Sequence, residues 1–299
     1  MAHHAHRETA AARSRGTLVL TLALTAGVSV VEGAGAWWTG SLALAAEAAH
    51  MLTDAAGLGL ALFAIWVAAR PATPAKTFGY YRAEILAALV NAVVLLGVAA
   101  LILLEAWARI VTPHRVQGGP MLAIAALGLA VNVACARLLR RDAQTSLNVR
   151  AAYLEVLNDA LSSLGVLVAA VVVTLTGWMV VDPLVSAGIA LFIVPRTWHL
   201  LRQAVNVLLE GTPAHLSLTD IEAAIVEVHG VRWVHDLHVW TLTSGREAMS
   251  AHVVVDDVGE SERLLSTLHA VLHARFGIDH TTIQLETEPP RVLQIKAPS

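Results

Sequence analysis

Six long apolar stretches dominate the chain between residues 17 and 209. A helix needs about 20 apolar residues to cross the hydrocarbon core of a bilayer. Short breaks rich in Pro, Gly or Trp separate the stretches, as between residues 70 and 82. The pattern predicts six transmembrane helices at about 17–38, 42–69, 83–110, 120–138, 149–176 and 182–209.

The hydrophobic pattern changes after residue 209, where charged residues become frequent. The shorter periods there predict helices at 219–228 and 260–276, and strands at 231–242, 247–255 and 281–286. This αββαβ order suits a small sheet covered by helices on one face. We therefore expect an N-terminal tail (1–16), a six-helix membrane domain (17–209) and a small α+β domain (210–299).

Composition supports a membrane protein and excludes several classes. Hydrophobic residues make up 56% of the chain and charged residues 14%, against about 25% in soluble domains. The net charge of −3, without a dense basic patch, argues against a nucleic-acid partner. Cys135 is the only cysteine, which excludes an intrachain disulfide and a cysteine-based zinc knuckle.

No catalytic motif or organic-cofactor signature is evident. Glu47-Ala48-Ala49-His50 is a Glu-x-x-His unit like those of di-iron bundles, but no second unit occurs in the spans. The zinc-protease and nucleophile-elbow motifs are also missing. We therefore expect no enzyme activity.

Lys and Arg residues indicate the orientation. Their excess marks cytoplasmic loops. Only Arg109 and Arg115 lie in the loops of the opposite side. The basic side collects Arg7, Arg13, Arg15, Arg70, Lys76, Arg82, Arg137, Arg140 and Arg141. Both termini are therefore expected in the cytoplasm, with the chain in the cell (inner) membrane.

Four polar residues inside the expected spans predict a metal site. His50 and Asp54 lie one helical turn apart in the second span, as do Glu155 and Asp159 in the fifth. Each ionised residue at this depth costs about 2.5–3.5 kcal/mol unless it is compensated. Two such pairs could close a four-coordinate divalent-metal site, as zinc prefers. Because ligands must be deprotonated to hold metal, metal and protons would compete, which predicts exchange of one for the other.

The motifs along the chain resemble those of the cation diffusion facilitator family. They include Gly40-Ser41-Leu42-Ala43-Leu44, the run from Glu47 to Asp54, the run from Gly79 to Leu89 with Asn91, the run from Asn158 to Gly165, Asp182-Pro183, the run from Leu209 to Pro213 and the run from His235 to Trp240. The resemblance implies a homodimeric metal-cation/proton antiporter with a transport site on helices two and five. It also implies a ferredoxin-like cytoplasmic domain.

One position departs from the family pattern. Zinc-type members usually carry His-x-x-x-Asp on both helices, whereas the fifth span here has Glu155 in place of that His. More oxygen ligands favour harder ions, so manganese, iron(II) and cobalt join zinc as candidates. The resemblance adds cadmium. Zinc remains the first choice.

The resemblance also implies a second metal site in the small domain. His235, His252 and Glu286 match zinc-binding positions of related domains, and His238 and His280 could assist. We expect this trio to be regulatory, although a strand histidine is often only a packed or exposed residue. His3, His4 and His6 could capture metal or be incidental to a tail.

Other polar residues of the spans could line the pathway, handle protons or bridge helices, namely Glu32, Glu47, Asn91, Asn132 and Asn158. Lys76 and Glu210 lie at opposite cytoplasmic edges of the bundle, and we hypothesise that they form a hinge ion pair. The expected function is export of divalent metal from the cytoplasm in exchange for protons. The alternative is a membrane-anchored metal sensor, which leaves the polar residues inside the spans unexplained.

Overall fold

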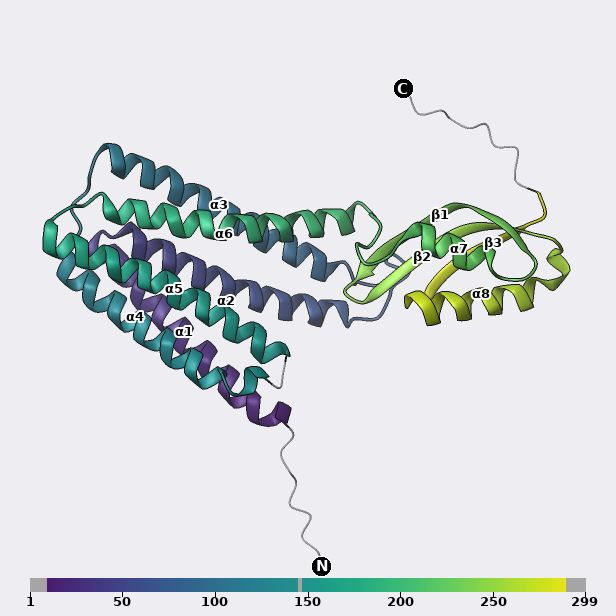
Figure 1. Cartoon of the computed structure of the whole chain (residues 1–299), viewed down its shortest axis with the longest axis horizontal. Coiled ribbons are helices and arrows are strands. Elements are labelled where there is room, and N and C mark those ends of the chain that lie inside the picture. The colour runs from purple at the N-terminus through teal and green to yellow at the C-terminus, as the bar shows by residue number, and fades with distance from the viewer. Residues whose placement is uncertain (1–9, 145–146, 289–299) are drawn as a thin grey trace, which may run out of the picture. The chain divides into compact units, whose positions relative to one another are not determined.

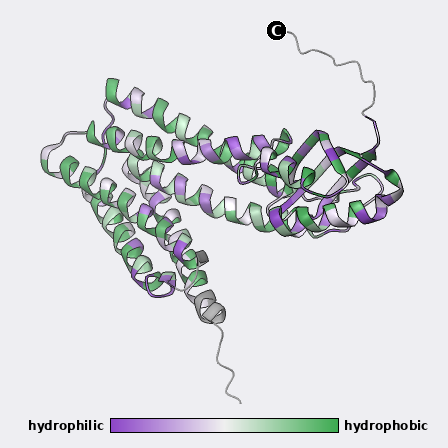
Figure 2. Cartoon of the chain, turned by 45° about the vertical axis from the view of Figure 1, so that its right-hand side comes forward, coloured by the Kyte–Doolittle hydropathy of each residue, from purple (hydrophilic) through white to green (hydrophobic). Residues whose placement is uncertain are grey.

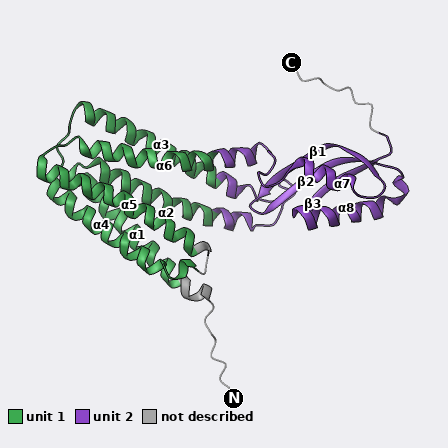
Figure 3. Ribbon diagram, viewed as in Figure 1, with its two compact units in different colours: residues 1–63, 87–201 green, residues 64–86, 202–299 purple. Residues whose placement is uncertain are grey.

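The computed structural model describes residues 10–144 and 147–288. The chain forms two compact units (Figure 3), each described here by itself. Unit 1 comprises residues 1–63 and 87–201, and unit 2 comprises residues 64–86 and 202–299. Three of the long helices therefore pass from one unit into the other.

Six long helices carry the apolar stretches (Figure 1). All six are long and apolar enough to cross a membrane, which confirms the prediction of six spans. Their bounds are α1 Ala10–Thr39, α2 Leu42–Ala68, α3 Ala83–Val111, α4 Gly118–Leu139, α5 Leu147–Thr176 and α6 Val181–Leu208.

The helices turn large apolar side chains outward and small ones inward. Leu62, Phe63, Leu101 and Leu104 are all exposed, and Figure 2 colours most of the length of these helices as hydrophobic. The buried cluster of unit 1 is instead rich in alanine, including Ala43, Ala46, Ala99, Ala125, Ala169, Ala170 and Ala190. Small residues let helix backbones approach closely where lipid gives no hydrophobic drive to pack.

A buried carboxylate ties the start of α6 to the start of α2. Asp182 is fully buried, and its Oδ2 accepts a hydrogen bond from the backbone N–H of Leu42 at 2.7 Å. Its Oδ1 accepts bonds from the Ser41 hydroxyl at 2.5 Å and from the Ala43 N–H at 3.2 Å. The first N–H groups of a helix have no partner within the helix and favour a negative charge. Asp182 therefore caps α2 from another helix.

The C-terminal domain has the predicted αββαβ order. It comprises α7 Leu218–Val226, β1 Val231–Thr243, β2 Arg246–Val255, α8 Ser261–Phe276 and β3 His280–Glu286. Strand β2 is central, pairing antiparallel with β1 and parallel with β3. Its alternate residues Val253 and Val255 pack with Ile221 of α7 and Leu268 of α8 in one buried cluster. This packing leaves the opposite face of the sheet free for polar side chains.

Polar contacts join the helix ends of unit 2 to the sheet. Glu84 of α3 accepts hydrogen bonds from the Thr243 and Ser244 hydroxyls at 2.5 and 2.9 Å. Glu210 pairs with Arg82 at 2.9 Å. The expected partner of Glu210 was Lys76, and that prediction is wrong: the Lys76 ammonium lies 5.6 Å from the centre of the Tyr80 ring instead.

Candidate metal sites

The second and fifth long helices present their polar residues at turn spacing. His50 and Asp54 of α2 are separated by one turn, and so are Glu155 and Asp159 of α5. All four belong to unit 1. The helical register therefore places two polar residues on one face of each helix.

The two helices bring their polar residues together. His50 Nε2 lies 3.5 Å from Asp54 Oδ2 and 3.8 Å from Asp159 Oδ1. Ligand atoms of His50, Asp54 and Glu155 all lie within 4.8 Å of one another. In a tetrahedral zinc site with bonds near 2.1 Å, neighbouring ligand atoms are about 3.4 Å apart. The two His50 distances are close to that spacing. Asp159 contacts His50 but is not one of the three residues whose ligand atoms converge.

Two buried polar atoms of this cluster have no hydrogen-bond partner among the residues that the structure describes. They are His50 Nδ1 and Asp159 Oδ1. Asp54, Glu155 and Asp159 also line a cavity of 380 Å³ with residues of α1 and α5. Polar atoms left without partners at membrane depth are costly, and a bound cation would compensate the carboxylates.

Arg196 of α6 adds a positive charge to this cluster. Its Nη1 donates to both oxygens of Glu155, at 2.7 Å to Oε2 and 2.9 Å to Oε1. The residue before it, Pro195, lies inside α6 and removes one helical hydrogen bond. The two residues lie within the expected sixth span.

A second polar group lies one turn further along the same two helices. Ser163 of α5 donates to Glu47 Oε1 and accepts from Asn132 Nδ2 of α4 at 2.9 Å. Asn132 therefore bridges two helices, one of the roles expected for it. Glu32 of α1 is fully buried, and neither of its carboxylate oxygens has a hydrogen-bond partner within residues 10–144 and 147–288. A Cβ on Gly128 of α4 would lie 2.1 Å from Glu32 Oε1, so only glycine leaves room for this carboxylate.

Asn91 and Asn158 occupy different surroundings. The Asn91 side chain of α3 packs against Gly57 of α2, where an added Cβ would lie 2.6 Å from its Nδ2. Gly57 is three residues beyond Asp54, so Asn91 is within one turn of the cluster. Asn158 is half-buried on α5, next to Asp159 in the chain.

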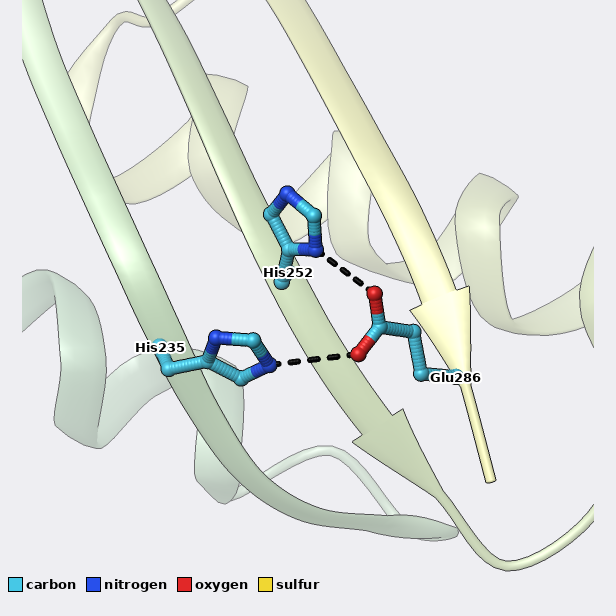
Figure 4. Close-up of side chains that lie close together, drawn as sticks. All are labelled: His235, His252 and Glu286. Carbon is cyan, nitrogen blue, oxygen red and sulfur yellow. Dashed lines mark hydrogen bonds and ion pairs between the residues drawn. The ribbon is translucent and has the colours of Figure 1, made fainter. Parts of the chain in front are cut away.

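The three strands of the C-terminal domain assemble a second cluster (Figure 4). His235 of β1 and His252 of β2 are directly paired across the antiparallel ladder, with ring centres 5.0 Å apart. Glu286 of β3 lies between them: its Oε1 is 2.6 Å from His252 Nδ1 and its Oε2 is 3.2 Å from His235 Nε2. Ligand atoms of the three residues lie within 4.8 Å of one another.

The electrostatics of this trio favour a charged carboxylate. Hydrogen bonds from His252 and then from His235 lower the pKa of Glu286 below its ordinary value. Two imidazole nitrogens and one carboxylate oxygen are ligand types that zinc prefers, and they leave a fourth position open. A bulge in β1 next to the trio carries Asp236, with a φ of 47°.

Other expected ligands lie away from both clusters. His238 is exposed on β1, opposite Ser250. His280 begins β3 at the end opposite Glu286 and stacks edge-on against Phe78, with ring centres 5.4 Å apart. His3, His4 and His6 lie outside the described residues.

Sequence reasoning missed Arg196, Ser163 and the capping role of Asp182. Arg196 is a cation inside an expected span, so the membrane-cost argument applied to the acids would also have singled it out. Ser163 lies four residues beyond Asp159, which extends the polar face of α5 by one turn. The partners of both residues are distant in sequence and became visible only in the structure.

Comparison with known proteins agrees with this architecture. Residues 18–209 match the family described as cation efflux transmembrane domain, and residues 213–288 match the cation efflux protein cytoplasmic domain. The metal cation efflux system protein CzcD of Cupriavidus metallidurans is 45% identical, covering 91% of this chain and 87% of its own length. The zinc transporter ZitB of Escherichia coli is 41% identical, with the same coverage.

Two further proteins are similar over different extents. The cadmium, cobalt and zinc/H⁺-K⁺ antiporter of Bacillus subtilis is 38% identical, covering 95% of this chain and 92% of its own. The solved metal-bound C-terminal domain of the CzcD transporter from Cupriavidus metallidurans shares 40% identity. It covers 24% of this chain and 99% of its own, with a TM-score of 0.23.

These matches identify the kind of protein. A multi-pass bundle with a C-terminal domain of this type is a membrane transporter of metal cations. The chain belongs to the cation diffusion facilitator family, whose members carry out divalent metal efflux.

Proposed function

We propose that this protein exports zinc from the cytoplasm in exchange for protons. The observation that carries the proposal is the convergence of His50, Asp54 and Glu155, with Asp159 beside His50, inside the membrane unit. A divalent ion bound there would compensate the carboxylates, and so would protons in its absence. The printed names of the relatives, a zinc transporter and a zinc/H⁺-K⁺ antiporter, support both the ion and the exchange.

The ligand set supports a metal range broader than zinc. Three carboxylates and one imidazole supply more oxygen than nitrogen, which favours harder divalent ions such as manganese, iron(II) and cobalt. Cadmium and cobalt appear in the name of the Bacillus subtilis relative. We propose zinc as the main substrate and these ions as secondary ones.

The second polar group, around Glu32 and Glu47, is proposed to line the ion pathway and to bind protons. Glu32 of α1 and Glu47 of α2 are fully buried carboxylates. Glu47 lies one helical turn before His50. In the described part of the chain, Glu47 Oε2 and both oxygens of Glu32 have no hydrogen-bond partner, so neutral carboxyl groups would fit these positions better than charged ones. Asn91 and Asn158 are proposed to line the path beside the main site.

The C-terminal domain is proposed to bind a regulatory metal ion and to dimerise. His235, His252 and Glu286 supply the ligands on the sheet face opposite the helices.

The proposed topology puts residues 17–209 in the inner membrane of the cell and both termini in the cytoplasm. Residues 210–299 then form the cytoplasmic domain. The histidines of tail 1–16 are proposed as a weaker capture site.

Zinc flux into proteoliposomes with an imposed proton gradient tests the transport site. Asp54→Ala and Asp159→Ala should each reduce flux to near background because each removes a ligand and a proton acceptor. Asp256→Ala, an exposed carboxylate of the C-terminal domain, is the matched control and should retain full flux. Normal flux in both site variants would remove the assignment. Zinc binding without flux in the unmodified protein would favour the sensor alternative.

A further inference from the structure

Arg196 compensates the negative charge of Glu155, which weakens the attraction of this carboxylate for a metal ion. Both carboxylate oxygens of Glu155 accept from the same guanidinium, at 2.7 and 2.9 Å. Yet Glu155 is also one of the three residues whose ligand atoms converge within 4.8 Å. A carboxylate engaged on both oxygens by a cation has its negative charge already compensated.

We propose that Arg196 is a tethered counter-ion that competes with the transported metal for Glu155. In the metal-free site Glu155 pairs with Arg196, and in the metal-bound site Arg196 releases Glu155 to the ion. The inference rests on the proposed transport function and adds to it a residue on a third helix. Arg196 thereby acts as a specificity and affinity determinant without contacting the metal.

The charges of the cluster support this exchange. Asp54, Glu155 and Asp159 carry three negative charges when ionised, and Arg196 carries one positive charge. One divalent ion added to these four groups and a neutral His50 gives a site of zero net charge. Without Arg196 the loaded site would keep one uncompensated negative charge, which is unfavourable at membrane depth and would hold the cation more tightly.

The exposure of the pair allows it to open. The Arg196 side chain is 61% exposed and the Glu155 side chain 30%, whereas His50 and Asp159 are 11% and 9% exposed. The protein therefore leaves the Arg196 side chain room to move away from Glu155. Pro195 removes a helical hydrogen bond at the adjacent residue, so α6 has a point of reduced stiffness where Arg196 is attached.

Steady-state zinc flux in proteoliposomes tests the proposal, because KM and the maximal rate can be measured separately for each variant. Arg196→Gln should lower the KM for zinc about fivefold, the scale of a partly exposed charge-assisted pair, since the competitor of the metal is gone. Its maximal rate should also fall, because Arg196 no longer helps to displace the ion from Glu155. Arg196→Lys keeps the positive charge on a more compact and more strongly hydrated ammonium group and should lie between.

A double-mutant comparison separates this role from a structural one. If Arg196 acts through Glu155, Arg196→Gln should change KM less than twofold in a Glu155→Gln background, while it changes KM fivefold alone. Arg202→Gln, the same change six residues along α6, is the control and should leave KM unchanged. Monodisperse elution in detergent confirms that each variant is folded.

The outcomes distinguish this inference from the proposed function. An unmodified protein without zinc flux would overturn the proposed function. A transporting protein whose Arg196→Gln variant keeps the same KM would overturn the counter-ion role alone. An equal change of KM in both backgrounds would assign Arg196 to the stability of α6 and would also overturn it.

Discussion

Glu155 is the residue at which this chain departs most from the expected zinc pattern. It contributes an oxygen to the cluster of His50 and Asp54 where the zinc-type pattern expects a histidine, and it pairs with Arg196. Ligand type and local charge therefore change together at one position. Metal preference should depend on this residue more than on the two aspartates.

Replacing Glu155 by His should narrow the metal range toward zinc. The change supplies a second imidazole, a ligand that suits zinc better than it suits manganese. Competition by manganese and cobalt against zinc flux in proteoliposomes should weaken about tenfold, which corresponds to ~1.4 kcal/mol of selectivity. Glu155→Gln is the control that removes the charge without adding a nitrogen. Unchanged competition in Glu155→His would contradict the proposed role of this position.

His252 should be required for metal binding in the C-terminal domain. Its Nδ1 is 2.6 Å from Glu286, and its loss would leave two ligands where zinc needs three or four. Calorimetry on the full chain carrying Asp54→Ala and Asp159→Ala would report this site without the transport site. Adding His252→Ala should abolish the remaining zinc binding, and adding the exposed His238→Ala should not. Equal binding in both proteins would reduce the trio to a structural role.

At the scale of elements, the helices are held together by a few buried polar contacts as well as by alanine packing. Asp182 caps α2 from α6, and Asn132 of α4 bridges to Ser163 of α5. In lipid such contacts have no competing water, so each polar group needs its partner inside the protein. The cap lies one to two turns before Glu47, so it supports the part of α2 that carries the proposed metal ligands.

Removing the cap should destabilise the membrane unit. Asp182→Ala leaves two backbone N–H groups and one hydroxyl without their acceptor, at a cost of about 2–4 kcal/mol. The apparent thermal midpoint in detergent should fall by several degrees. Asp182→Asn keeps one acceptor oxygen and should lose less. Equal midpoints for Asp182→Ala and the unmodified protein would show that the cap contributes nothing measurable.

At the scale of the whole molecule, a membrane unit with titratable ligands and a second unit with its own ligand trio suit regulated exchange. The sign of the coupling follows from competition: protons displace metal from the ligands on the acidic side, and metal displaces protons on the other. The proposed exchange of zinc for protons therefore requires the compartment that receives zinc to be the more acidic one.

Zinc accumulation in inverted vesicles should accordingly follow the proton gradient. Vesicles with an acidic interior should accumulate zinc, and collapsing the gradient with an ionophore that exchanges protons for potassium should stop it. Vesicles containing the Asp54→Ala protein give the background. Accumulation that persists after collapse would contradict proton exchange, and accumulation driven by an imposed potassium gradient at constant pH would point to potassium as a counter-ion.

The sequence by itself predicted the six spans, the αββαβ order and the polar residues of helices two and five. Those features depend on local periodicity: about 20 apolar residues per span, alternation along strands, and i, i+4 spacing on one helix face. The trio of the sheet and its zinc-binding character came from the resemblance to a family. The structure shows that His235, His252 and Glu286 lie on three adjacent strands of the sheet.

Only the tertiary structure decided which groups meet across the chain. It paired Arg196 with Glu155, 41 residues apart, and Asp182 with Leu42, 140 residues apart. It also showed that Glu210 pairs with Arg82 and not with Lys76, although Arg82 and Lys76 are both cations near the same loop. The physical reason is common to all three cases. Periodicity shows which face a side chain occupies, but its partner depends on how helices pack and where their ends meet, and no local pattern encodes that geometry.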